Sequence, residues 1–220
     1  MDIDIYADVV CPWCYIGKRR LEKALARFDG DVSVTFKPFQ LDPSTPTDAR
    51  PLFDWLAPKF GGLDRARNIT ARTTELAVGE GIELNYDTAV IANTFEAHRL
   101  IWFARPTGRG PETIEALHRA HFTEGRNIGS RDELAAIAVE VGFDESTVRE
   151  FLDSDAGVAE VTTELQTAHE LGIAGVPTFV IDGKYAITGA QDTEILLGAL
   201  NEVRRRAADA ARPNPSPSGV

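Results

Sequence analysis

Residues 3–14 read IDIYADVVCPWC and contain both cysteines of the chain, Cys11 and Cys14. The mostly apolar run at residues 3–10 predicts a strand in the centre of a sheet. Residues 15–28 place apolar side chains at helical spacing with charged residues between them, which predicts a helix. A strand that leads into a CxxC motif at the start of a helix is typical of a thiol–disulfide redox site.

The position of Cys11 at the mouth of the predicted helix favours redox chemistry over the alternatives. Unpaired amides at a helix N-terminus stabilise an anion, so Cys11 is expected to form a thiolate, the form that attacks disulfides, more readily than a free cysteine. A two-residue spacer closes too short a loop for a structural disulfide to constrain the unfolded chain. A structural zinc site usually takes four ligands, and the four histidines lie far from Cys14 in sequence: His98, His118, His121 and His169. We therefore expect no metal.

The composition limits the binding partners and the cellular compartment that we expect for this protein. The 220 residues are 43% hydrophobic and 26% charged, with a net charge of −11. This acidity argues against general binding to nucleic acid or to anionic membranes, which both require basic patches. Neither an N-terminal secretory pattern nor an apolar run long enough to cross a membrane is present. We expect a cytoplasmic protein, in a compartment that keeps thiols reduced.

Further along the chain, the pattern predicts the order βαβ, then helices, then αββα. The second strand, at 32–36, alternates with period two and should run parallel to the first. Ser130 and Glu133 suggest a capping box, and Asp182-Gly183 suggests a two-residue hairpin turn. The remaining predicted helices are 54–60, 64–80, 88–103, 111–123, 131–141, 146–152, 154–171 and 192–206, and the remaining strands are 178–181 and 185–188.

This order is the thioredoxin arrangement. We predict an α/β, thioredoxin-like fold with a large all-helical insertion between the second and third strands. The thioredoxin-like domain should be discontinuous, formed by residues 1–45 and 153–208, and the insertion should occupy 46–152. The end of the chain, 209–220, is rich in proline and serine and is predicted to be a disordered tail.

Four segments, in this order, resemble one known family. They are DVVCPWCYIG at 8–17, NTFEAHRL at 93–100, FTEGRNI at 122–128 and GVPTF at 175–179. The chain resembles the DsbA-like thioredoxin family, and more closely its cytoplasmic FrnE-like branch, over nearly its whole length excluding the tail. The resemblance implies that Cys11 attacks a substrate disulfide and that Cys14 resolves the mixed disulfide.

The residues between the cysteines, Pro12 and Trp13, tune the reduction potential in this family. The Pro-Trp pair differs from those of well-known oxidants and reductants, so the direction of the reaction stays open. Trp13 is also a candidate for substrate contact. The resemblance further implies a cis-proline at Pro177, which would leave the backbone of Val176 free to pair with a substrate peptide. The alternative is a trans proline that enters an edge strand.

Several further residues are weaker candidates. Asp8 is a possible proton acceptor for Cys14, or a strand-end residue bonded to backbone. His98 and Asn93, with Arg99, could line a substrate cleft beneath the insertion, or be ordinary helix residues. The same alternatives apply to His121 and Arg126, near the third motif. Gln191 and Asp192 match the place where glutathione-using relatives hold the γ-glutamyl end, and a helix N-cap is the simpler interpretation of Asp192.

We therefore predict a thiol–disulfide oxidoreductase or isomerase that acts on protein or small-molecule disulfides. No cofactor is expected, with glutathione as a possible redox partner, and a homodimer is possible. One alternative is a glutathione-dependent isomerase or transferase related to 2-hydroxychromene-2-carboxylate isomerase, whose relatives usually carry serine at the position of Cys11. The other is a non-catalytic chaperone or polyketide-pathway binding module.

Overall fold

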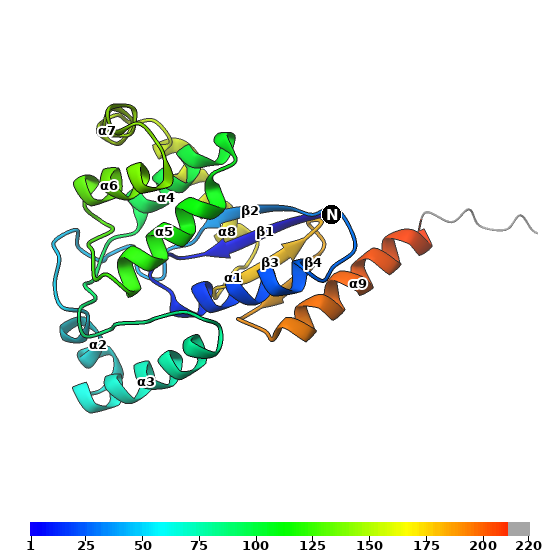
Figure 1. Ribbon diagram of the computed structural model, residues 1–220, viewed down its shortest axis with the longest axis horizontal. Coiled ribbons are helices and arrows are strands. Elements are labelled where there is room, and N and C mark those ends of the chain that lie inside the picture. The colour runs from blue at the N-terminus through cyan, green and yellow to red at the C-terminus, as the bar shows by residue number, and fades with distance from the viewer. Residues whose placement is uncertain (211–220) are drawn as a thin grey trace, which may run out of the picture.

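A four-stranded sheet forms the centre of the molecule in the computed structural model, which describes residues 1–210 (Figure 1). The strand order is β2-β1-β3-β4, with β1 parallel to β2 and β3 antiparallel to both β1 and β4. The strands are β1 (Asp2–Ala7), β2 (Ser33–Pro38), β3 (Thr178–Ile181) and β4 (Tyr185–Thr188). Strand β1 lies in the middle of the sheet, between β2 and β3, which agrees with its mostly apolar sequence.

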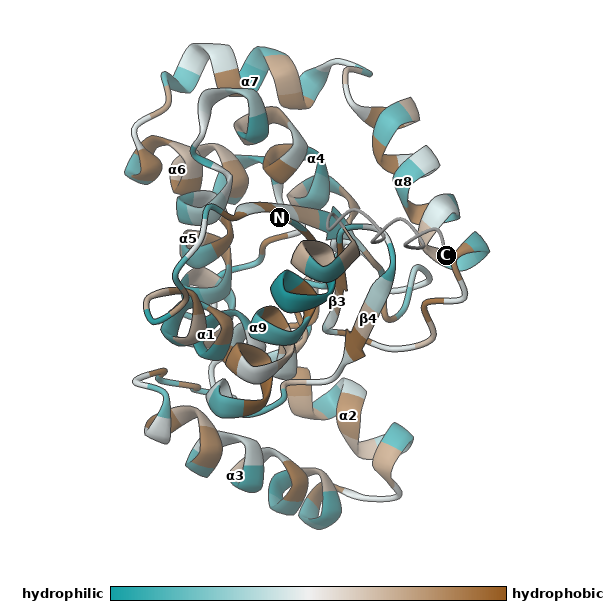
Figure 2. Cartoon of the chain, turned by 90° about the vertical axis from the view of Figure 1, so that its right-hand side faces the viewer, coloured by the Kyte–Doolittle hydropathy of each residue, from teal (hydrophilic) through white to brown (hydrophobic). Residues whose placement is uncertain are grey.

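Helices surround this sheet and extend beyond one end of it. Helices α1 and α9 cover one face, whereas α8 lies on the other (Figures 1 and 2). The outer helices carry both hydrophilic and hydrophobic residues, as expected when one face of a helix is buried (Figure 2). The helices are α1 (Pro12–Leu25), α2 (Leu52–Phe60), α3 (Leu63–Gly79), α4 (Phe95–Ala104), α5 (Gly110–Phe122), α6 (Arg131–Val141), α7 (Glu145–Asp153), α8 (Val158–Glu170) and α9 (Thr193–Ala210), with a 3₁₀ turn, η1 (Arg105–Thr107).

Helices α2 to α7 lie between β2 and β3 in the sequence and gather at the end of the sheet towards which β1 runs (Figure 1). The predicted fold class, a thioredoxin-like α/β fold with a helical insertion, is confirmed. The inserted helices meet at the same end of the molecule as the cysteine motif, so they can limit which molecules reach the cysteines.

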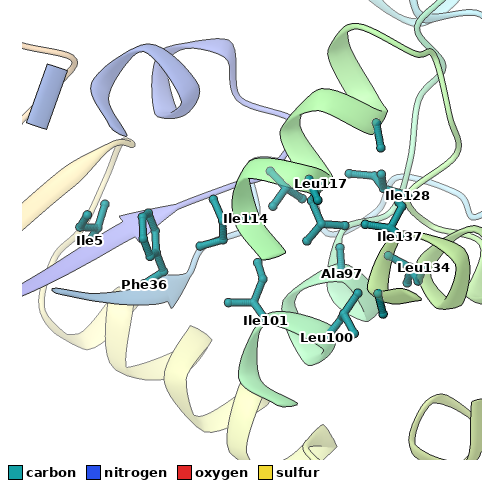
Figure 3. Close-up of a cluster of buried hydrophobic side chains, with 14 of the residues drawn as sticks. Ile5, Phe36, Ala97, Leu100, Ile101, Ile114, Leu117, Ile128, Leu134 and Ile137 are labelled. Atoms are coloured by element: carbon teal, nitrogen blue, oxygen red, sulfur yellow. The ribbon is translucent and has the colours of Figure 1, made fainter. Parts of the chain in front are cut away.

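One hydrophobic core joins the sheet to the inserted helices. It runs from Ile5 and Phe36 on the strands, through Leu117 of α5, to Leu134 and Ile137 of α6 (Figure 3). Burying a side chain of this size contributes about 1.5–3 kcal/mol. The insertion is thus packed on the sheet through a shared core, and the domain boundaries at 46 and 152 stay a prediction.

Several predicted boundaries are wrong for local reasons. Strand β1 ends at Ala7, because the chain turns there and the Cys11 amide donates to the Asp8 carbonyl at 3.0 Å. Helix α1 therefore begins three residues earlier than predicted, with Pro12 in its first turn, where a missing amide proton costs nothing. The predicted helix at 88–103 begins only at Phe95, because the segment before it forms a β-bridge through Val90.

Two further predictions need correction and one is confirmed. The capping box is absent: Ser130 makes no side-chain cap bond, and Glu133 instead accepts from Arg126. Helix α9 continues to Ala210, so the predicted disordered tail is wrong for residues 209–210; the rest of it lies outside the described residues. The hairpin turn is present, and Asp182 and Gly183 both have positive φ, 49° and 65°.

Candidate active site

The cysteine motif lies where β1 runs into α1. Cys11 is the N-cap residue of α1, and Pro12 follows it in the first turn. Cys11 is 4% exposed, and its Sγ lies 3.8 Å from the carbonyl oxygen of Val176, a residue 165 positions later. Both cysteines are free thiols. The fold thus brings the first cysteine to the mouth of a helix and against the segment before β3.

Cys14 lies one helical turn further, below Cys11. Its amide donates to the Cys11 carbonyl at 3.0 Å, and its side chain is 2% exposed. Burial, followed by the hydrogen bond with the Cys11 thiol, raises the pKa of Cys14 well above its ordinary value. Cys14 is therefore protonated near neutral pH and needs a base before it can attack.

The segment opposite the motif contains a cis peptide bond between Val176 and Pro177, as the family resemblance implies. Helix α1 approaches this segment closely at Gly17. A Cβ atom at that position would lie 2.9 Å from Pro177 Cγ and 3.3 Å from Phe179 Cζ. Sequence reasoning quoted Gly17 within the motif but missed this packing role, although a glycine inside a predicted helix could have indicated a close approach.

Asp8 is buried beside the cysteines, at 1% exposure. Its Oδ2 accepts from the Leu41 amide at 2.8 Å. His98 Nε2 lies 3.4 Å from Oδ1 but forms its hydrogen bond with the Phe39 carbonyl at 3.0 Å. Oδ1 consequently has no hydrogen-bond partner among the described residues. Asp8 can thus accept a proton next to Cys14.

The other predicted cleft residues of the insertion lie behind the site. His98 is 4% exposed and bonded to backbone. Arg99 is 1% exposed, and its guanidinium donates to the Ser154 and Ala156 carbonyls, so it holds the chain after α7. Asn93 donates to the Thr45 carbonyl at 2.8 Å and thereby ties the loop before α2 to the start of α4.

The remaining weak candidates also make internal bonds. Arg126 pairs with Glu133 and Glu140 on α6. Gln191 donates to the Thr188 carbonyl at 2.9 Å, and Asp192 pairs with Arg20 of α1 at 2.8 Å. These contacts position the helices around the site.

A cavity of about 180 Å³, which we call the α2 cavity, adjoins Asp8. His121, named above as a cleft candidate, lines it and is 1% exposed. Burial lowers the pKa of His121 to about 4, against an opposing effect of Asp8, so its ring is neutral near pH 7. Sequence reasoning missed the apolar wall, which is formed by Val10, Leu41, Leu52, Trp55, Leu56, Ile91 and Ala92.

Residues 1–210 contain neither a metal-binding cluster nor a membrane-spanning helix. No cluster of three or more histidine, cysteine, aspartate or glutamate side chains could hold a metal ion there. Within the same residues, no helix is both long and apolar enough to span a membrane.

The fold and the site together define a class. A strand that ends in a CxxC helix start, set against a cis-proline segment on a β2-β1-β3-β4 sheet, is the arrangement of a thioredoxin-like dithiol protein. The chain belongs to the DSBA-like thioredoxin domain family, whose pattern matches residues 2–201. Membership supports a thiol–disulfide oxidoreductase or isomerase in general terms.

Known proteins agree with this assignment. The uncharacterized protein YwbO of Bacillus subtilis is 29% identical over 208 residues, 93% of this chain and 98% of YwbO. The crystal structure of the probable DsbA oxidoreductase SCO1869 from Streptomyces coelicolor is similar over 100% of this chain and 94% of that one, with 32% identity and a TM-score of 0.88. The cytosolic disulfide reductase DsbM from Pseudomonas aeruginosa shares the fold, with 22% identity, a TM-score of 0.65, and coverage of 94% and 100%.

Proposed function

We propose that this chain exchanges disulfides with protein or small-molecule substrates, with Cys11 as the attacking and Cys14 as the resolving thiol. The observation that carries this proposal is the contrast between the two cysteines. Both cysteines are buried, but Cys11 sits at the helix N-terminus against the Val176 carbonyl, whereas Cys14 lies one turn further along, where burial raises its pKa and keeps it protonated. A helix N-terminus favours the anionic form of a thiol placed there.

The reaction follows from these positions. The Cys11 thiolate attacks one sulfur of the substrate disulfide, the substrate S–S bond breaks, and the second substrate sulfur leaves as a thiolate. Cys14 then gives its proton to Asp8 and attacks the Cys11 sulfur. This step releases the reduced substrate and leaves a disulfide between the two cysteines. Each step is reversible, so the same site can oxidise or reduce.

Substrate backbone is proposed to lie along Val176, whose carbonyl already faces Cys11. An extended peptide that pairs there would bring its cystine to the thiol. Pro12 and Trp13 follow Cys11, and Trp13 is 41% exposed, which favours direct contact with the substrate. His98 and Asn93 are not proposed as contacts, because both are bonded within the fold.

Glutathione is the proposed external thiol, and the cytoplasm the proposed compartment. A structure of DsbM, the cytosolic relative in fold, was determined with glutathione. Two glutathione molecules would reduce the Cys11–Cys14 disulfide and leave as glutathione disulfide, which balances the cycle.

The test compares the intact protein with Cys11→Ser and Cys14→Ser in exchange with a disulfide-bonded peptide. We expect Cys11→Ser to abolish exchange and Cys14→Ser to accumulate a mixed disulfide, detected by mass spectrometry. Exchange by the intact protein no faster than by free glutathione refutes the proposal. Glutathione-dependent isomerisation would then support the isomerase hypothesis. Client binding that survives the loss of both thiols would support the binding-module hypothesis.

A further inference from the structure

We propose that Glu115 is a positioning residue for the second step of the proposed reaction: it fixes α1 so that Cys14 stays within reach of Asp8. This inference rests on the proposed function, because it concerns the resolving step of that same reaction. Three observations carry it: the donors that Glu115 binds on α1, an aromatic stack between α1 and α5, and the contact of α5 with the surroundings of Asp8.

Glu115 of α5 accepts hydrogen bonds from donors on α1, the neighbouring helix that carries both cysteines (Figure 1). Its Oε1 accepts from the Tyr15 hydroxyl at 2.7 Å and from the Arg19 guanidinium, and its Oε2 accepts from the Lys18 ammonium at 2.6 Å. Burial raises the pKa of Glu115, but Lys18 and the other donors more than offset this effect and lower the pKa to about 2. Glu115 is therefore a carboxylate at neutral pH, and hydrogen bonds to a charged group are stronger than those between neutral groups.

Tyr15 connects this anchor to the resolving cysteine. It directly follows Cys14 in the chain and is 5% exposed. Its ring stacks on the His118 ring of α5, with the ring centroids 4.6 Å apart. Glu115 and His118 are three residues apart and therefore neighbours on the surface of α5. Because α5 holds Tyr15 both at its hydroxyl and along its ring, α1 cannot slide or rotate next to Cys14 without breaking one of these contacts.

The next turn of α5 lies beside the proposed base. His121 follows His118 by three residues and lines the α2 cavity together with Asp8. After the larger effect of burial, the charge of Asp8 acts on the pKa values of both His121 and Cys14, so both groups lie near this carboxylate. Helix α5 thus contacts the cysteine helix through one turn and the surroundings of Asp8 through the next. It thereby sets the distance between the thiol that loses a proton and the carboxylate that accepts it.

The attacking cysteine does not depend on this anchor. The Cys11 amide donates to the Asp8 carbonyl at 3.0 Å, and its Sγ lies 3.8 Å from the Val176 carbonyl oxygen. These contacts belong to the N-cap itself, so they persist when α1 shifts slightly against α5. The same shift changes the reach between Cys14 and Asp8, and a misplacement of about 1 Å can slow a positioned step by about 10². Loss of the Glu115 anchor should therefore slow resolution and spare attack.

The test measures both steps in one time course. Reduced protein is mixed with a disulfide-bonded peptide, quenched with acid, and analysed by mass spectrometry, which distinguishes the reduced protein, the mixed disulfide and the Cys11–Cys14 disulfide. Glu115→Gln keeps the shape of the side chain and removes its charge. It should slow the conversion of the mixed disulfide by about tenfold or more, and change the rate of its formation by less than about twofold. Unchanged conversion, equal slowing of both steps, or slowing of formation alone overturns the proposal.

Glu80→Gln is the matched control, because Glu80 binds the same helix further from Cys14. Glu80 follows α3 and accepts from Arg20 and from Lys23 of α1, each at 2.6 Å. Its replacement loosens α1 without removing the bond to the residue next to Cys14, so conversion of the mixed disulfide should stay within about twofold of the intact protein. If Glu80→Gln slows conversion as much as Glu115→Gln, any loosening of α1 has this effect and the proposal is overturned.

Tyr15→Phe provides a second variant that does not change any charge. It removes the hydroxyl that Glu115 binds and keeps the ring that stacks on His118. Conversion of the mixed disulfide should slow in Tyr15→Phe, and this effect should shrink when Glu115→Gln is already present, because the two residues act through one hydrogen bond. Normal conversion in Tyr15→Phe, or effects of the two changes that multiply, overturns the proposal.

The same time course separates the two proposals. If the intact protein forms no mixed disulfide, or if Cys11→Ser exchanges as fast as the intact protein, the proposed function is overturned and this inference with it. If exchange requires Cys11 and Cys14 as proposed, but Glu115→Gln converts the mixed disulfide at the rate of the intact protein, only the inference about Glu115 is overturned.

Discussion

Replacing Gly17 by alanine is expected to destabilise the protein by overpacking the contact between α1 and the cis-proline segment. The added Cβ would lie 2.9 Å from Pro177 Cγ and 3.3 Å from Phe179 Cζ, closer than carbon atoms pack without strain. Both neighbours are ring atoms of buried residues, so neither can turn away as the end of a flexible side chain could. The helix must move instead.

The magnitude follows from two opposing effects. An extra methyl group in a packed interior costs about 1–3 kcal/mol, whereas alanine in place of glycine inside a helix contributes about 0.5–1 kcal/mol of stability. Gly198 in α9 provides a matched control, because a Cβ there meets nothing within 4 Å. Gly198→Ala should therefore show only the stabilising effect. The difference in the free energy of unfolding between the two variants is expected to be about 1–3 kcal/mol.

Urea denaturation of both variants, with the free energy extrapolated linearly to water, measures this difference. Gly17→Ala should also slow disulfide exchange, because the helix that carries both cysteines shifts against Val176. If Gly17→Ala is as stable as Gly198→Ala, the close approach of α1 to Pro177 does not constrain this position and the reasoning is refuted.

Three further predictions concern buried polar groups. Burial lowers the pKa of His118 to about 3, so between pH 6.5 and 4 only the unfolded chain takes up a proton at this histidine. Its contribution to stability is therefore complete above pH 6.5 and is lost as the pH falls. His118→Phe should reduce the pH slope of the free energy of unfolding by about 1.4 kcal/mol per pH unit, and an unchanged slope contradicts the assignment. Asp8→Asn should slow the attack of Cys14 by about 10² or more, with recovery as pH rises, in single-turnover release of a mixed disulfide; a wild-type rate near pH 7 would exclude Asp8 as the base. Arg99→Met should cost at least about 2 kcal/mol in urea denaturation, since it removes the hydrogen bonds of a buried guanidinium to the Ser154 and Ala156 carbonyls and its ion pair with Glu96. Arg149→Met at an exposed pair should change little, so equal effects would count against the prediction.

The sequence by itself determined the strand, the CxxC helix start and the βαβ…αββα order. These features rest on neighbouring residues: an apolar run, helical spacing, and the turn at Asp182-Gly183. It also placed Pro177 opposite the cysteines, through the likeness of its short segment to a known family. Local patterns were less successful at residues 88–94, because this apolar segment, which forms a β-bridge from Val90 to Pro51, resembles a helix in composition.

Only the tertiary structure decided which polar residues could serve the site. His98 and Arg99 carry the same side chains whether they line a cleft or hold a loop, and their partners, Phe39 and Ala156, lie 59 and 57 residues away in sequence. The α2 cavity likewise joins Asp8 to Trp55 and His121, which no local pattern relates. Spacing along the chain reports the periodicity of an element, whereas burial and pairing depend on contacts between distant segments, and those contacts exist only after the chain has folded.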